Sequence, residues 1–267
     1  MKYIIFILLT ITLSCSSKKD PIMETLTYKA PVVDSLYLAC GIVQKYKNKI
    51  SEKNLGVYVG IKIVYQDGIL GPISSDQANS TIISNLNTSF NKTGISFILL
   101  GSELSYFQSN IGNFVKEFPK YELKEYVTIV VYPSNDEVGI NGIAAGVPST
   151  VVGIVADRIG KPTLPHEMGH ALGLKHIFEP DYTDGKNIHT GDGICDTPSY
   201  NIMNQSSLNC TYIGAPYYTE EDLKIIIPNY ENYSYEKEDC RKEFTPGQIL
   251  VMKWHLQNFP ALFNTLQ

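Results

Sequence analysis

The stretch TLPHEMGHALGLKH, residues 163–176, holds three of the five histidines of this 267-residue chain. His166 and His170 are four residues apart, so on a helix both side chains project from one face, a turn apart. Gly173 follows three residues later, and because glycine adopts positive φ without steric penalty, it can end the helix and turn the chain. That turn would bring His176 to the same point. We therefore expect three imidazoles to converge on one cation.

Three neutral imidazoles and one water form the open tetrahedral site that is typical of catalytic zinc. Zinc lowers the pKa of its bound water towards about 7 and polarises a carbonyl group. Glu167 lies beside the first histidine, where as general base it would take the proton of that water and deliver it to a leaving amine. The pattern predicts peptide hydrolysis. Histidines without a metal and a noncatalytic zinc site are the alternatives, and a purely structural site would not need Glu167.

The rest of the chain alternates between strand and helix patterns. Val57, Val59, Ile61 and Ile63 alternate with other residues, which is a strand pattern. Ser74, Ser75 and Asp76 offer N-caps for one helix, and Thr245, Pro246 and Gln248 form a capping box for another. We expect strands around 57–63, 95–100, 126–132 and 150–156, a short edge strand within 142–148, and helices at about 75–91, 164–172 and 246–258. This order predicts an α/β fold, with residues 177–243 irregular.

The first residues are typical of an export signal. Lys2 precedes the apolar run 3–14, which is too short to span a bilayer comfortably, and Cys15 follows it. Ser14 and Cys15 resemble a bacterial lipobox, although Thr12 stands where leucine is usual. We expect acyl chains on Cys15 to tether the exported protein to a membrane of the bacterial envelope. Plain cleavage with secretion and an uncleaved anchor are the alternatives.

The composition is that of an ordinary globular protein, with 43 % hydrophobic residues, 18 % charged residues and a net charge of -5. The chain has no basic stripe, so we expect no nucleic-acid partner.

HExxHxxGxxH is the metzincin signature among zinc proteases, and residues 56–262 resemble the pappalysin-like metzincins, especially their bacterial cytophagalysin-type members. The segments that carry the resemblance are SSDQ (74–77), LNTSFNKTGISFIL (86–99), the zinc segment, GDGICDTP (191–198), CTYIG (210–214) and CRKEFTPGQI (240–249).

This resemblance implies an α/β (α+β) metzincin-type fold: a twisted, mostly parallel sheet with two long helices above an irregular C-terminal subdomain that ends in a helix. It divides the chain into a signal peptide (1–15), a linker and pro-segment (16–54) and a catalytic domain (55–267, with subdomains 55–173 and 174–267). It implies a monomeric, exported zinc endopeptidase acting on protein or peptide substrates, whose edge strand, expected at 142–146, pairs with extended substrate. The alternative is a zinc-fold surface lipoprotein that binds peptides without cleaving them.

Metzincins also carry a methionine beneath the zinc in a tight turn, with a tyrosine two residues later in several families. The segment ENYSYEKEDC (231–240) matches this turn, with Tyr233 at the methionine position. Tyr235 is then the candidate that ligates zinc at rest or hydrogen-bonds the oxyanion, and the alternative is an exposed tyrosine without this role. Met203 is the other candidate methionine, with Gln205 at the tyrosine position, but it precedes CTYIG, and we favour the later segment.

Asp192 and Thr197 resemble a calcium-binding loop of the same family, since oxygen ligands suit that hard ion. The alternative is a turn-rich loop with solvated acids. His189 and His255 fall outside the ligand set, and we expect both at the surface.

Once Cys15 is assigned, four cysteines remain, and disulfides are expected in an exported protein. Cys40, Cys195, Cys210 and Cys240 allow three complete pairings. The resemblance makes Cys40 a candidate latency residue whose thiolate occupies the open position of zinc, with a disulfide or an inert thiol as alternatives. If Cys40 has that role, we expect Cys210 to pair with Cys240.

Overall fold

The computed structural model of the chain describes residues 54–65, 74–106, 116, 118–123, 126–133, 140–178, 191–194, 196–198, 207–208, 210–212, 218–233, 240–258 and 265–266. The predictions for the signal peptide, the pro-segment, Cys15, Cys40, His189, Cys195, Met203, Gln205 and Tyr235 lie outside these residues. No helix in the described ranges is long and apolar enough to cross a membrane.

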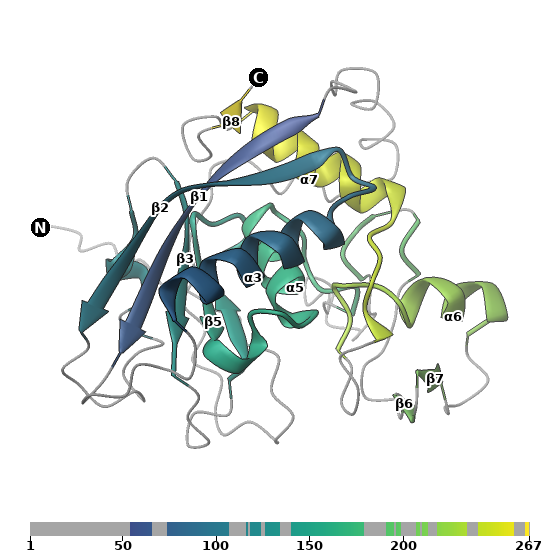
Figure 1. Cartoon of the computed structure of the whole chain (residues 1–267). Coiled ribbons are helices and arrows are strands. Elements are labelled where there is room, and N and C mark those ends of the chain that lie inside the picture. The colour runs from purple at the N-terminus through teal and green to yellow at the C-terminus, as the bar shows by residue number, and fades with distance from the viewer. Residues whose placement is uncertain are drawn as a thin grey trace, which may run out of the picture.

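A mostly parallel sheet forms the centre of the molecule, with the strand order β2-β1-β3-β5-β4 (Figure 1). The parallel strands are β1 (Leu55–Tyr65), β2 (Ile95–Tyr106), β3 (Val127–Tyr132) and β5 (Val151–Val155). The edge strand β4 (Gly142–Ala144) is antiparallel to β5, and the short β8 (Thr265–Leu266) is antiparallel to β1. The α/β class and the edge strand are thus confirmed.

The middle strands are apolar because both of their faces are covered. Every residue of β3 and β5 is buried. Val127, Ile129 and Val131 of β3 face the main core, whereas Val130 and Tyr132 belong to a second cluster on the other face. Strands buried on both faces carry apolar runs in place of alternation.

Two helices cover the main-core face of the sheet. In α3 (Ser75–Ser89), Ser74 is the N-cap, and its side chain accepts a hydrogen bond from the backbone nitrogen of Gln77. Ala78, Ile82 and Leu86 form the buried face of that helix. The second helix, α5 (Thr163–Ala171), contains the first part of the histidine motif and follows the 3-10 turn η3 (Ala156–Arg158). The Asn85 side-chain amide fixes α3 to the approach to α5, because it donates to the carbonyl groups of Ile159 and Lys161.

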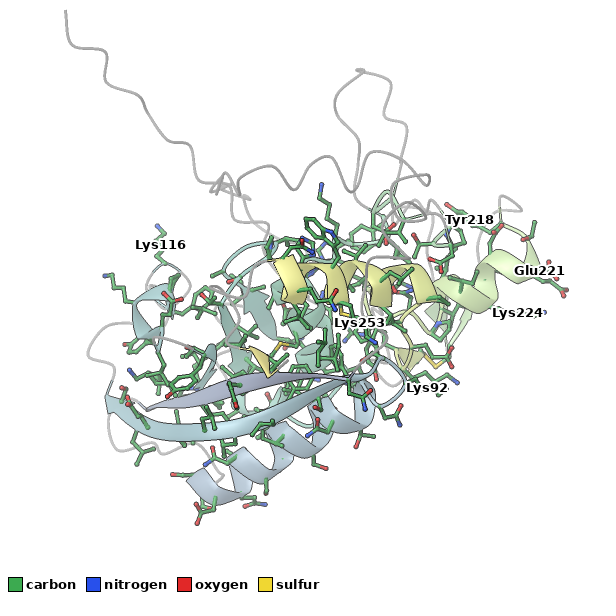
Figure 2. All side chains as sticks on the ribbon, turned by 90° about the horizontal axis from the view of Figure 1, so that it is seen from above. Lys92, Lys116, Tyr218, Glu221, Lys224 and Lys253 are labelled. Atoms are coloured by element: carbon green, nitrogen blue, oxygen red, sulfur yellow. A yellow bond between two sulfur atoms is a disulfide. The ribbon has the colours of Figure 1, made fainter. Side chains whose placement is uncertain are left out.

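The last helix, α7 (Pro246–Asn258), begins and ends as predicted and lies over the same core (Figures 1 and 2). Its capping box is present: the Gln248 backbone nitrogen donates to Thr245 Oγ1, and the Thr245 backbone nitrogen donates to Gln248 Oε1. The remaining elements are η2 (Phe118–Tyr121), the two-stranded β6 (Ser207–Leu208) and β7 (Thr211–Tyr212), and α6 (Glu220–Ile226).

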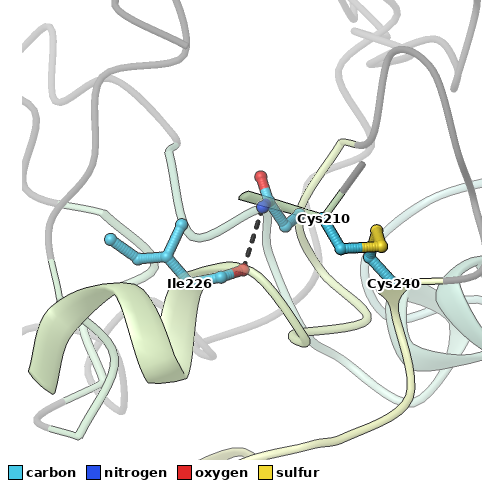
Figure 3. The surroundings of a disulfide bond; sticks show 4 residues. Cys210, Ile226 and Cys240 are labelled. Carbon is cyan, nitrogen blue, oxygen red and sulfur yellow. Dashed lines mark hydrogen bonds between the residues drawn. A yellow bond between two sulfur atoms is a disulfide. The ribbon is translucent and has the colours of Figure 1, made fainter. Parts of the chain in front are cut away.

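A disulfide joins Cys210, beside β7, to Cys240, shortly before α7 (Figure 3). The two Cα atoms are 5.4 Å apart, and the bond closes a sequence separation of 30 residues. This is the pairing expected from the sequence for the case in which Cys40 is the latency residue.

Candidate metal centre

The three histidines of the motif meet at the C-terminal end of α5. His166 and His170 lie on one face of this helix, and all three histidines are buried. After Ala171 the chain turns at Gly173, whose φ is +100° and whose backbone nitrogen donates to the His170 carbonyl. The turn brings His176 back, so that one ring nitrogen from each histidine lies within 4.8 Å of the others. This is the predicted convergence.

The hydrogen bonds of the two helical histidines leave one nitrogen of each ring for a metal. His166 Nδ1 lies 2.6 Å from the Tyr230 carbonyl oxygen, and His170 Nδ1 lies 2.8 Å from that of Leu174. A carbonyl oxygen only accepts, so both Nδ1 atoms carry the proton and both Nε2 atoms keep a lone pair. His170 Nε2 is 3.0 Å from His176 Nε2. Ring nitrogens that keep a lone pair are suitable ligands for zinc.

Burial favours the neutral imidazole that a metal needs. It lowers the pKa of His166 well below the usual 6.5, and the neighbouring charges of His170 and Arg241 lower it further. A neutral ring can donate its lone pair to a cation.

Glu167 is buried next to the first histidine and packs against the edge strand β4. A Cβ atom on Gly142 would come within 2.9 Å of Glu167 Oε1, so β4 approaches the carboxylate closely only because residue 142 has no side chain. The general-base candidate, which follows His166 in the sequence, therefore lies against the strand expected to hold substrate.

The segment 231–233 lies against the histidines. Tyr233 was expected at the methionine position, and Glu231, two residues earlier, also approaches the helical histidines: its Oε2 lies 3.2 Å from His170 Nδ1 and 3.7 Å from His166 Nδ1. Burial raises the pKa of Glu231 well above its usual value, and so does the charge of Glu167, while Arg241 acts in the opposite direction. Tyr233 stands two residues after Glu231, which is the spacing between the methionine and the tyrosine of the metzincin turn.

Tyr233 contacts the metal-binding cluster directly. Its ring centroid is 4.8 Å from that of His176 and 5.9 Å from that of His166. Phe178 stacks on His176 at 4.6 Å and also contacts Tyr233. The turn resemblance placed Tyr233 near the zinc, but the sequence analysis did not identify Phe178, because nothing in its spacing marks it as a neighbour of the histidines.

Asp192 and Thr197 do come together. The Thr197 hydroxyl donates to Asp192 Oδ1 and lies 2.7 Å from the Ile194 carbonyl oxygen, and the Ile194 backbone nitrogen donates to the same carboxylate at 2.9 Å. Asp192 is only 2 % exposed, and burial raises its pKa to about 7. It is therefore not one of the solvated acids of the alternative interpretation.

The prediction that His255 lies at the surface is wrong. His255 is fully buried on α7, where its Nδ1 lies 3.0 Å from the Val251 carbonyl oxygen and its ring packs against Gly173. Burial lowers its pKa to about 4. The signal was its spacing of four and three residues from Val251 and Met252, which places it on the core face of the helix.

The fold and the site together define a metzincin-type metalloprotease: a mostly parallel sheet, a helix with two histidines, and a third histidine beyond a glycine turn.

The comparisons with known proteins agree with this class. Residues 155–257 match peptidase family M43, described as pregnancy-associated plasma protein-A. An extracellular metalloprotease of Arthroderma benhamiae is 28 % identical over 224 residues, which are 74 % of this chain and 71 % of the relative. One from Sordaria macrospora is 28 % identical over 217 residues, 71 % of each chain.

Among solved structures, archaemetzincin from Methanopyrus kandleri matches with a TM-score of 0.38 and 10 % identity over 75 % of this chain and 97 % of that one. Metalloproteinase-II from Bacteroides fragilis matches with a TM-score of 0.33 and 13 % identity over 48 % and 45 %. The match of residues 155–257 to this family, the sequence relatives and the three-histidine site together support a pappalysin-like zinc metalloprotease.

Proposed function

We propose that the protein is an exported endopeptidase that holds zinc on His166, His170 and His176 and uses Glu167 as its general base. The observation that carries this proposal is the direction in which the imidazole rings are held. Both helical imidazoles are held by their Nδ1 atoms, three ring nitrogens converge, and a buried carboxyl group lies beside the first of them. A site that only stabilised the fold would not need that carboxyl group.

Zinc, when bound, supplies a Lewis acid that polarises the scissile carbonyl and lowers the pKa of a water. Glu167 accepts a proton from the attacking water and delivers it to the leaving amine. Its burial beside β4 keeps it close to a peptide on that strand. We propose Tyr233 for the oxyanion role expected of Tyr235, because the Tyr233 ring contacts two of the ligand histidines, whereas Tyr235 lies outside the described residues.

The outer edge of β4 is the proposed substrate-binding strand. Its inner edge pairs with β5, and an extended peptide can add to the other side through main-chain hydrogen bonds. Such pairing holds the peptide backbone, which makes proteins and peptides the substrate class.

Export is supported by the relatives, which are named extracellular metalloproteases. We propose a precursor with a signal peptide (1–15), a pro-segment (16–54) and a catalytic domain (55–267), which acts as a monomer and is tethered through a lipid on Cys15. Cys40 is its proposed latency residue.

We also propose a calcium ion at Asp192 and Thr197. Three oxygen atoms converge there, from the carboxylate, the hydroxyl and the Ile194 carbonyl, which is a suitable donor set. Thermal unfolding of the zinc-loaded protein should shift to lower temperature when calcium alone is chelated. An unchanged transition would refute the calcium site.

Casein digestion by the full chain and by a Cys40→Ala variant tests the enzymatic function. Glu167→Ala should abolish digestion while leaving bound zinc at one equivalent. Glu221→Ala should retain full activity, since this exposed side chain projects from the outer side of α6 (Figure 2). Digestion that persists in Glu167→Ala would refute general-base catalysis by Glu167. Zinc-loaded protein that binds peptides but never cleaves them would favour the noncatalytic alternative.

A further inference from the structure

We propose that Glu231 is a positioning residue for the metal ligands, a buried carboxylate that orients both helical imidazoles and strengthens metal binding at the expense of the stability of the metal-free protein. This inference rests on the zinc site of the proposed function, and it concerns binding of the metal separately from cleavage.

The contacts of Glu231 are directed at the ligand pair. Its Oε2 lies 3.2 Å from His170 Nδ1 and 3.7 Å from His166 Nδ1, which are the ring edges opposite the Nε2 atoms. The single proton on each Nδ1 is donated to a backbone carbonyl, so Glu231 Oε2 lies close to these N–H groups as a second acceptor without a hydrogen bond of its own. Acceptors at this edge fix the orientation of a ligand imidazole and make its other nitrogen a better donor.

The helix is shaped to accept this carboxylate. Gly169 lies between the two helical histidines, and a Cβ atom there would lie only 1.9 Å from Glu231 Oε1. The carboxyl group therefore occupies the space of a missing side chain and packs onto the helix backbone. A larger residue at position 169 would push it away from the imidazoles.

The backbone around Glu231 is held without the carboxylate. The Glu231 nitrogen donates to Asn229 Oδ1 at 2.9 Å, and the Glu231 carbonyl accepts from the Ile177 nitrogen at 3.3 Å, directly after His176. Asn229 is itself held by the Gln248 side chain. Substitution of the carboxyl group alone should thus leave the turn in place.

The charges near Glu231 favour a bound cation. Glu167, Asp192 and Glu231 are all buried carboxyl groups, and neither carboxyl oxygen of Glu231 has a hydrogen-bond partner among the described residues. Like charges in a buried site destabilise the protein. A divalent cation on the imidazoles reverses that effect, so the same group destabilises the metal-free protein and stabilises the metal-bound one.

Glu231→Gln and Glu231→Met test the proposal in the full chain. Glutamine keeps the shape and removes the charge, whereas methionine keeps the approximate length and removes all polarity. Glu243→Gln is the matched control, because this exposed glutamate lies in the segment that leads to α7. The zinc Kd is measured by competition with a chromophoric chelator, and the urea midpoint is measured on the metal-free protein.

We expect the Kd for zinc to rise about 10- to 100-fold in both variants, while the urea midpoint of the metal-free protein rises and the control changes neither value. An ordinary structural residue would lower affinity and stability together, and that result would overturn the proposal. A parental Kd in Glu231→Gln would also overturn it, and this variant decides the outcome if Glu231→Met does not fold. Zinc binding by the parent without casein digestion would instead refute only the proposed protease activity.

Discussion

Replacement of Gly173 by alanine tests how the third histidine is held. At a φ of +100°, a residue with a side chain is strained by roughly 1–2 kcal/mol. The new Cβ would also lie 2.3 Å from Cε1 and Nδ1 of His255, and overpacking of this kind costs about 1–3 kcal/mol. We expect Gly173→Ala to lower the free energy of unfolding by about 2–5 kcal/mol, a large fraction of the stability of a typical domain. It should also weaken zinc binding, because His176 follows the turn.

The two contributions can be separated with a double-mutant cycle in urea unfolding. In Gly173→Ala/His255→Ala the steric conflict is absent but the backbone strain remains, so the double variant should be about 1–3 kcal/mol more stable than the sum of the single changes predicts. Gly101→Ala is the control, because a Cβ atom there meets no atom within 4 Å. A loss below about 1 kcal/mol for Gly173→Ala, or additive single effects, would refute the reasoning.

Three further predictions concern stability. His255 has a pKa of about 4 in the folded protein and 6.5 in the unfolded chain. Its contribution to the free energy of unfolding is therefore fully present above pH 6.5 and is lost as the pH falls to 4, which lowers that free energy by up to about 3 kcal/mol. His255→Gln should flatten the pH dependence of urea unfolding in that window, and an unchanged slope would argue against burial of the neutral ring. Cys210→Ala/Cys240→Ala should lower the free energy of unfolding by roughly 3–4 kcal/mol, from the loop that the bond closes; if dithiothreitol shifts the parent and this variant equally, the disulfide does not contribute. Asp196→Ala should cost about 1–2 kcal/mol, because its carboxylate caps the start of α7 through the Gly247 nitrogen at 2.7 Å. A urea midpoint equal to that of the parent would exclude this capping role.

The elements that the sequence predicts well are those specified by neighbouring residues. The N-cap at Ser74 and the capping box of Thr245 with Gln248 mark helix starts within one turn of the chain. The convergence of the three histidines was equally predictable, because one helix turn and one glycine suffice to bring them together.

The features that escaped prediction depend on distant partners. β2 continues to Tyr106, well beyond its apolar run, because β1 supplies hydrogen bonds along its whole length, and Leu104 there is 53 % exposed. Glu231 comes from the irregular C-terminal half and reaches the helix of the motif only through the fold. A polar residue that is buried by such long-range packing has no periodicity of its own.

The short edge strand has a consequence for solubility. An unprotected sheet edge can recruit another copy of the same protein as readily as a substrate. β4 contains only three residues and therefore extends for about 10 Å, which limits how many main-chain bonds an intruding strand can form. In the proposed function a substrate gains additional attraction from the zinc site, whereas a second copy would have only the short edge, so the shortness of β4 disfavours aggregation.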